Sequence, residues 1–154
     1  MHKHRKTTVT EGLQSEIFVP ITPEPVWTPV TKELKDMRVA LATAAGVHLK
    51  TDPRFNLAGD TGFREIPGDT QPDALMVSHG GYDNADVNKD INCMFPISRL
   101  QELAEEGFIK EVAPIHYGFM GGGGDQTAFT EQTGPEIARL LNEEKVDAVI
   151  MTAG

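Results

Sequence analysis

The chain has 154 residues, of which 39% are hydrophobic and 24% are charged, and its formal net charge is −9. This size fits one domain with a single core. No apolar run approaches the roughly 20 residues of a membrane-spanning helix, and no basic face suits a nucleic-acid backbone. The basic start, residues 1–6, is not followed by a hydrophobic segment, so it is not a secretory signal and we expect a soluble, cytoplasmic protein.

Residues 1–36 are predicted to form an extended N-terminal arm. Prolines at positions 20, 23, 25 and 29 prevent a continuous helix around the apolar side chain of Trp27. The arm either docks against the domain or a neighbouring subunit, or packs as a leader of the same domain. Residues 37–154 are predicted to form an α/β domain.

Strands and helices are predicted to alternate within that domain. The expected elements are a strand over 37–43, an irregular loop over 51–69, a strand over 74–78, a helix over 96–106, a strand over 109–117, a helix over 130–144 and a strand over 147–152. The last strand is apolar and β-branched, as is typical of a strand covered on both faces. The pattern predicts a three-layer α/β sandwich with a mainly parallel sheet.

A glycine-rich segment, 121–125, lies between a predicted strand and a predicted helix. Bare backbone amides there can approach an anion, and a helix start adds positive potential, which suits a carboxylate or a phosphate. The GxGxxG spacing and the lysine of a phosphate loop are both absent, so a dinucleotide or triphosphate site is not supported. The alternative is a tight turn that binds nothing.

His79 follows the strand predicted at 74–78 and is expected to face the same crevice. A histidine there can move a proton or orient a carboxylate. The alternative is a structural histidine whose hydrogen bonds are satisfied within the fold.

No metal site is predicted. The acidic run over 83–90 lacks the glycine and the final glutamate of a calcium loop, so we interpret it as a solvated loop. His48 and His116 have no partner at metal-ligand spacing. Cys93 is the only cysteine and is expected to be a buried, unreactive thiol because no activating cation is adjacent in the sequence.

Seven segments together resemble the glycine/sarcosine/betaine/D-proline reductase selenoprotein family. They are 12–16 (Gly-Leu-Gln-Ser-Glu), 27–30 (Trp-Thr-Pro-Val), 54–57 (Arg-Phe-Asn-Leu), 78–83 (Ser-His-Gly-Gly-Tyr-Asp), 86–92 (Asp-Val-Asn-Lys-Asp-Ile-Asn), 121–125 (Gly-Gly-Gly-Gly-Asp) and 152–154 (Thr-Ala-Gly). The resemblance covers nearly the whole chain. The short leader before these motifs favours the branch that reduces D-proline.

The resemblance implies that the catalytic residue is a selenocysteine directly after Gly154, at a UGA codon that is commonly read as a stop. The chain would then be an amino-terminal fragment, incomplete at its C-terminus, with no catalytic residue of its own and no activity alone. A selenol at a helix start would be ionised and stabilised there, as cysteines are.

The implied reaction is the reductive ring opening of D-proline to 5-aminovalerate. D-proline condenses with a pyruvoyl group on a different subunit, and the selenolate attacks the α-carbon and breaks its bond to the ring nitrogen. A thiol then attacks the selenium, which releases the product carbon to be protonated and forms a selenium–sulfur bond. A dithiol or redox-protein donor reduces that bond. The residues expected to line the site or bind substrate are His79, Gly121, Gly122, Gly123, Gly124, Asp125, Thr152 and Gly154.

Two other functions stay open. A non-catalytic α/β module could use the glycine loop to bind a small anion or a partner. A nicotinamide or flavin oxidoreductase of the Rossmann type is disfavoured by the incomplete glycine fingerprint.

Overall fold

The computed structural model describes residues 28–121 and 125–153, and residues 1–27, 122–124 and 154 lie outside the described part. The chain divides into two compact units, Met1–Thr31 and Lys32–Gly154, and the described helices and strands all belong to the second. The predicted N-terminal arm lies largely outside the described residues. Its boundary at residue 36 stays a prediction.

The described helices and strands of the second unit run from residue 34 to residue 152. In chain order the elements are the 3-10 helix Leu34–Asp36, β1 (Arg38–Thr43), β2 (Val47–Leu49), β3 (Phe63–Pro67), the 3-10 helix Pro72–Ala74, β4 (Leu75–Val77), the 3-10 helix Ile91–Cys93, α1 (Ile97–Glu105), β5 (Glu111–Val112), β6 (Ile115–Phe119), α2 (Gln126–Ala128), the π-helix Phe129–Thr133, α3 (Gly134–Glu143) and β7 (Ala148–Thr152).

The main sheet has five strands, and four of them are parallel. β1 pairs in parallel with β5, β6 and β7, whereas β3 joins the far side of β6 antiparallel. β5 and β6 follow one another along one edge of β1, so β7 occupies the other edge and lies at the margin of the sheet. The predicted α/β class with a mainly parallel sheet is confirmed.

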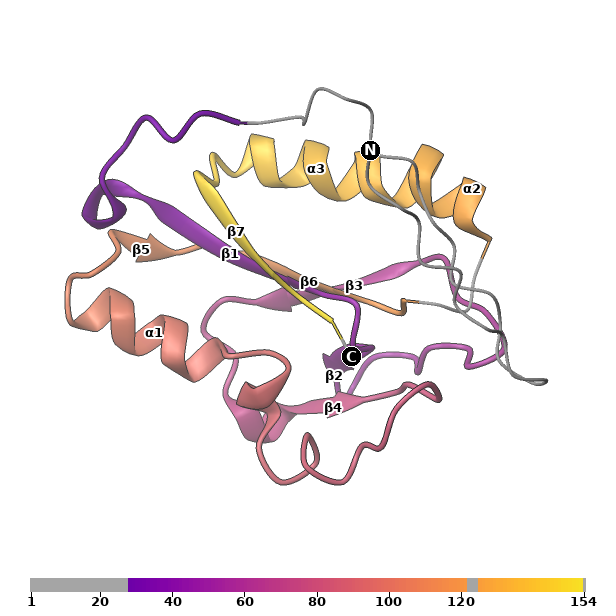
Figure 1. The fold of residues 1–154 in the computed structure, drawn as a ribbon. Helices are drawn as coiled ribbons and strands as arrows, with labels where there is room; N and C mark the ends of the chain where they lie inside the picture. The colour runs from indigo at the N-terminus through magenta and orange to yellow at the C-terminus, as the bar shows by residue number, and fades with distance from the viewer. Residues whose placement is uncertain (1–27, 122–124, 154) are drawn as a thin grey trace, which may run out of the picture. The chain divides into compact units, whose positions relative to one another are not determined.

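Helices lie on both sides of this sheet: α1 on one face, and the stretch from α2 to α3 on the other (Figure 1). Two separate apolar clusters result. Leu41 packs with Phe95, Ile97 and Leu100 on the α1 side, and Ala42 packs with Tyr117, Phe119 and Ile137 on the α3 side. Leu41 and Ala42 are consecutive residues of β1, so their side chains point to opposite faces, as a strand buried on both sides requires.

Helix α1 has clear start and stop signals. The backbone N–H and the hydroxyl of Ser98 both donate to Asn92 Oδ1, at 3.1 Å and 2.9 Å, which satisfies an amide of the first turn. The helix ends before Gly107, which has a φ of +77°. The helix predicted over 96–106 is confirmed.

The strand predicted over 109–117 is wrong as one element, because a bulge divides it into β5 and β6. Val39 pairs with Val112 and Ala42 with Tyr117, so two residues of β1 face four residues of the other strand. Pro114 lies in this bulge and has no amide to donate to a ladder. The amide of Leu41 donates instead to Nδ1 of His116, at 3.1 Å.

The residues between β1 and α1 also differ from the prediction. Residues 51–69 are not all loop, since β3 forms inside them; the flanking glycines and prolines had obscured its short pattern. The strand predicted at 74–78 forms as β4, but it pairs antiparallel with β2 in a separate two-stranded sheet. Gly46 directly precedes β2 and has a φ of +70°, a backbone conformation that favours glycine. A Cβ at this position would lie 2.3 Å from the carbonyl oxygen of Ser78, so a side chain does not fit there.

The helix predicted over 130–144 begins earlier, at Gln126, and is not one regular helix. It passes through a π-helical stretch, Phe129–Thr133, and continues as α3 from Gly134. Pro135 is in the first turn of α3 and has no N–H to donate to the preceding helical turn. The regular hydrogen-bond ladder is interrupted next to it, where the amide of Gly134 donates to the carbonyl of Phe129, five residues back.

β7 forms where it was predicted, but it is not covered on both faces. Val149, Ile150 and Met151 are 37%, 41% and 69% exposed. The start of the strand is fixed by Asp147, whose carboxylate accepts from the amide of Arg38 at 2.9 Å and pairs with Lys32 at 2.6 Å. Lys32 and the Arg38 amide lower the pKa of that carboxyl.

Candidate functional site

The carboxyl ends of β1, β6 and β7 meet at Ala44, the residue directly after β1. The amide of Ala44 donates to the carbonyl of Thr152 at 3.0 Å, and its carbonyl accepts from the amide of Gly121 at 2.9 Å. The backbone of one residue therefore joins the end of β7 to the start of the glycine segment. In open α/β sheets, ligands bind at this edge.

The side chain of Thr152 is held as firmly as its backbone. Its Oγ1 lies 2.7 Å from Oγ1 of Thr43 and 2.5 Å from the carbonyl oxygen of Met94, in the segment before α1. Oγ1 of Thr43 also accepts from the amide of Ala45 at 3.2 Å. We call Thr43, Thr152 and the Met94 carbonyl the threonine clasp.

His79 lies at the same edge, on the other side of Gly121. Its Nδ1 accepts from the amide of Gly81 at 2.9 Å, so the ring proton is on Nε2, which donates to the carbonyl of Gly121 at 3.2 Å. His79 follows β4, which belongs to the two-stranded sheet and not to the main sheet. The amide of Ser78, directly after β4, donates to the carbonyl of Gly46.

Tyr82 supports the His79 ring. The two ring centroids are 4.8 Å apart, and the phenol donates to the carbonyl of Ala45 at 2.9 Å. Burial raises the pKa of the Tyr82 phenol, and Cys93 nearby raises it further. The phenol therefore stays a neutral donor at physiological pH.

The described part of the chain thus links three predicted site residues, His79, Gly121 and Thr152, through Ala44. Asp125 has a different position: its Oδ1 accepts from the amides of Thr127 and Ala128, which caps the start of the helical stretch. Gly122, Gly123, Gly124 and Gly154 lie outside the described residues. The role of these residues as site lining stays a prediction.

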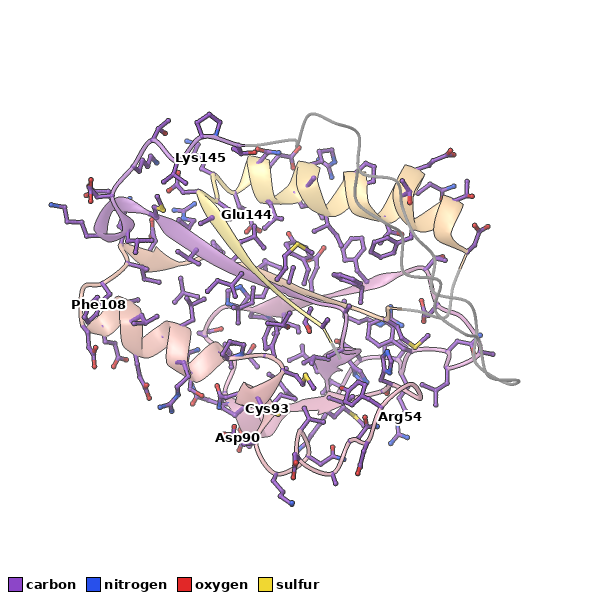
Figure 2. The ribbon with its side chains drawn as sticks, viewed as in Figure 1. Arg54, Asp90, Cys93, Phe108, Glu144 and Lys145 are labelled. Carbon is purple, nitrogen blue, oxygen red and sulfur yellow. The ribbon has the colours of Figure 1, made fainter. Side chains whose placement is uncertain are left out.

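Cys93 is exposed, so the expectation of a buried thiol is wrong. Figure 2 shows it beside Asp90 on the segment that precedes α1. The Asp90 side chain accepts from the Asn92 amide and so holds this segment as a 3-10 turn, which directs Ile91 to the core and Cys93 outward. Cys93 directly precedes Met94, whose carbonyl belongs to the threonine clasp.

Other parts of the described chain offer no comparable site. The described residues hold no group of three histidine, cysteine or acidic side chains close enough to bind a metal ion. Within the described residues, no helix is both long and apolar enough to cross a membrane. A cleft of about 630 Å³ near the end of α1, lined in part by Asp69, Gln101 and Glu105, contains none of the predicted site residues.

The sequence analysis missed Tyr82 and Met94, and it also missed Thr43 and Ala44 at the end of β1. A signal for Thr43 and Ala44 exists, because both neighbouring strands end in the same Thr-Ala pair, at 43–44 and at 152–153. The parallel register places the two threonines opposite each other.

The site can now be compared with known proteins. The profile of the family described as glycine/sarcosine/betaine reductase selenoprotein B matches residues 7–154. The chain belongs to this family.

The relatives fall into two groups by their sequence identity to this chain. The chain is 74% identical over 147 residues to the D-proline reductase subunit gamma of Acetoanaerobium sticklandii, a match that covers 96% of the chain and 61% of that relative. It is 30% identical to a glycine reductase complex component B subunit gamma of Carboxydothermus hydrogenoformans and 29% identical to a sarcosine reductase complex component B subunit beta of Peptoclostridium acidaminophilum. Each of these two matches covers 93% of the chain and 34% of the relative. No solved structure gives a significant match.

Proposed function

We propose that the chain is part of the selenoprotein subunit of D-proline reductase, an oxidoreductase assembled from several subunits. The observation that supports this most is the 74% identity to the D-proline reductase subunit gamma, against 30% and 29% to the glycine and sarcosine reductase subunits. The chain spans 61% of the length of that relative, so the residues described here account for part of such a subunit.

The proposed reaction is the reductive ring opening of D-proline to 5-aminovalerate in the cytoplasm. A selenocysteine directly after Gly154 would supply the nucleophile, a pyruvoyl group on a partner subunit would activate the substrate amine, and a dithiol would be the reductant. The chain described here would contribute the edge that presents the reacting residue, namely the end of β7 and the Gly121 segment, joined by Ala44.

His79 and Gly121 are proposed to form the wall of this edge. The Nε2–H of His79 is already committed to the Gly121 carbonyl, and Nδ1 to the Gly81 amide. Both nitrogens are therefore occupied in this conformation, and His79 is better suited to fixing the glycine segment than to carrying a proton. Gly122, Gly123, Gly124 and Asp125 complete the proposed lining.

The test is expression of the full-length protein in an anaerobic host that inserts selenocysteine, together with its pyruvoyl-containing partner. We expect about one selenium atom per subunit and formation of 5-aminovalerate from D-proline, with no product from glycine or L-proline. Omission of the partner should abolish the activity. A full-length product without selenium, or one with selenium that reduces glycine and not D-proline, would contradict the proposal; the former would favour an anion-binding or partner-binding module.

A further inference from the structure

We propose that Thr43 is a positioning residue for the reactive residue that follows β7, acting through the threonine clasp. This inference rests on the proposed function, because the proposed selenocysteine lies three residues after Thr152. Thr43 itself is fully buried in β1. It does not touch the reacting atoms and acts only through Thr152.

The protons of the clasp can be assigned from its geometry. Each threonine hydroxyl has one proton to donate. The Met94 carbonyl oxygen lies 2.5 Å from Thr152 Oγ1 but 3.4 Å from Thr43 Oγ1, so Thr152 donates to it and Thr43 donates to Thr152 Oγ1 at 2.7 Å. The Ala45 amide donates to Thr43 Oγ1. This arrangement uses each hydroxyl proton once and runs as one directed chain.

The clasp matters because the last part of β7 is held from one side only, by its ladder with β1. The middle of the strand, Val149 to Met151, is exposed on both faces, and its outer edge has no partner among the described residues. Its start is fixed by Asp147. Its end is fixed by the clasp and by the bond from the Ala44 amide to the Thr152 carbonyl, so these contacts determine where the residues after Thr152 begin.

The clasp also links three segments that are far apart in the sequence. The clasp ties β1 and β7 to the segment before α1, which carries Met94 and the exposed Cys93. Replacement of the Thr43 hydroxyl by a methyl group keeps the side-chain volume but leaves the Ala45 amide without its acceptor and Thr152 without its donor. The hydroxyl of Thr152 then keeps only its bond to the Met94 carbonyl.

The test uses the full-length selenoprotein assembled with its partner, as the variants Thr43→Val, Thr43→Ser and Thr152→Val. We expect Thr43→Val to lower kcat about fivefold, which is the effect that the loss of one hydrogen bond supports. KM for D-proline should change less than about twofold, because in the proposed reaction the partner's pyruvoyl group holds D-proline. Alkylation of the selenol by iodoacetamide below pH 6 should slow similarly, and Thr43→Ser should restore both rates.

Thr133→Val is the matched control. Thr133 is also a buried threonine whose hydroxyl donates to a backbone carbonyl, but its acceptor is Thr61, in the segment before β3, and not a residue of β7 or of the threonine clasp. We expect it to lower the urea midpoint as much as Thr43→Val does while leaving kcat and the alkylation rate unchanged. If Thr43→Val loses stability but keeps both rates, as Thr133→Val should, the positioning role is wrong.

A third measurement separates this inference from the proposed function. In the full-length protein without its partner, hydrogen exchange of the Ala44 amide should accelerate about fivefold in Thr43→Val and Thr152→Val but not in Thr133→Val. Unchanged exchange in both clasp variants overturns the clasp even if D-proline is reduced. A wild-type protein that fails to reduce D-proline overturns the proposed function, and the exchange result still decides whether the clasp holds the end of β7.

Discussion

The backbone amide of Leu41 donates its hydrogen bond to Nδ1 of His116, at 3.1 Å, in the gap that the bulge between β5 and β6 opens in the sheet. His116 is fully buried, and burial lowers its pKa from 6.5 to about 4. A protonated ring could not accept this bond. The imidazole therefore replaces a backbone carbonyl as a partner of β1.

We predict that this bond makes the fold sensitive to acid. The unfolded chain takes up the proton near pH 6.5 and the folded chain only near pH 4, so the stability is complete above pH 6.5 and is lost progressively as the pH falls toward 4. The full shift corresponds to about 3 kcal/mol. Urea titrations between pH 7.5 and 4 measure it. His116→Asn keeps an acceptor that does not titrate and should flatten this part of the profile; an equally steep loss in the variant would contradict the assignment.

A second prediction concerns the close approach of β6 to β2. A Cβ at Gly118 would lie 1.9 Å from the carbonyl oxygen of Val47, which is backbone and cannot rotate away. Gly118→Ala should therefore lower the free energy of unfolding by about 3 kcal/mol, the upper range for overpacking. Gly80→Ala is the control, since nothing lies within 4 Å of its Cβ position. Equal urea midpoints for the two variants would disprove the tight contact.

A third prediction tests how His79 holds the glycine segment. His79→Ala removes the bond to the Gly121 carbonyl, so hydrogen exchange of the Gly121 amide, itself bonded to Ala44, should accelerate about fivefold. Amide exchange followed by NMR gives the rate. Asn88→Ala, on an exposed part of the neighbouring loop, should leave the rate unchanged. No change in His79→Ala would mean that the ring does not restrain the segment.

A fourth prediction follows from the exposed thiol. Cys93 should react with iodoacetamide in the folded protein without denaturant, because its side chain is accessible. Mass spectrometry should show one added carbamidomethyl group, and Cys93→Ser should show none. If modification of Cys93 requires urea, the sequence-based expectation of a buried thiol was correct.

A fifth prediction concerns the apolar margin formed by β7. Exposed apolar side chains on an unpaired strand edge favour association and bind hydrophobic dyes. The 154-residue chain should therefore bind such a dye, and Met151→Lys should reduce both the fluorescence and the apparent mass in sedimentation. Leu57→Lys changes another exposed apolar residue, 58% exposed, outside the sheet and should have a smaller effect. A monodisperse wild-type chain that binds no dye would contradict the prediction.

The strands and helices with regular patterns could be predicted from the sequence. β1, α1 and β7 each carry an uninterrupted apolar pattern, and the α/β class follows from their order. β3 was missed because it has only five residues, ends in Pro67 and lies between Gly62 and Gly68, so turn residues obscured its strand pattern. The division into β5 and β6 depends on the His116 side chain, which accepts a hydrogen bond from β1 in place of a backbone carbonyl. The hydrophobic periodicity of the sequence carries no sign of such an exchange.

The position of the site could be predicted from the sequence, but the hydrogen bonds that hold its residues could not. His79, Gly121 and Thr152 were expected at one edge because strand ends gather there, and the described structure links them. Their common neighbour, Ala44, acts only through its backbone, which no residue type can signal. Cys93 was expected to be buried because free cysteines usually are, but the Asp90 cap fixes a turn that faces it outward.

The bulge between β5 and β6 adds an even number of residues, two, relative to β1. Since side chains alternate along a strand, an even addition leaves inward and outward positions unchanged downstream. Tyr117 and Phe119 thus still reach the cluster under α3. Loss or gain of one residue at Pro114 would exchange the two faces of β6. The rings of Tyr117 and Phe119 would then point toward the opposite layer, so this short segment can change in length only by two residues at a time.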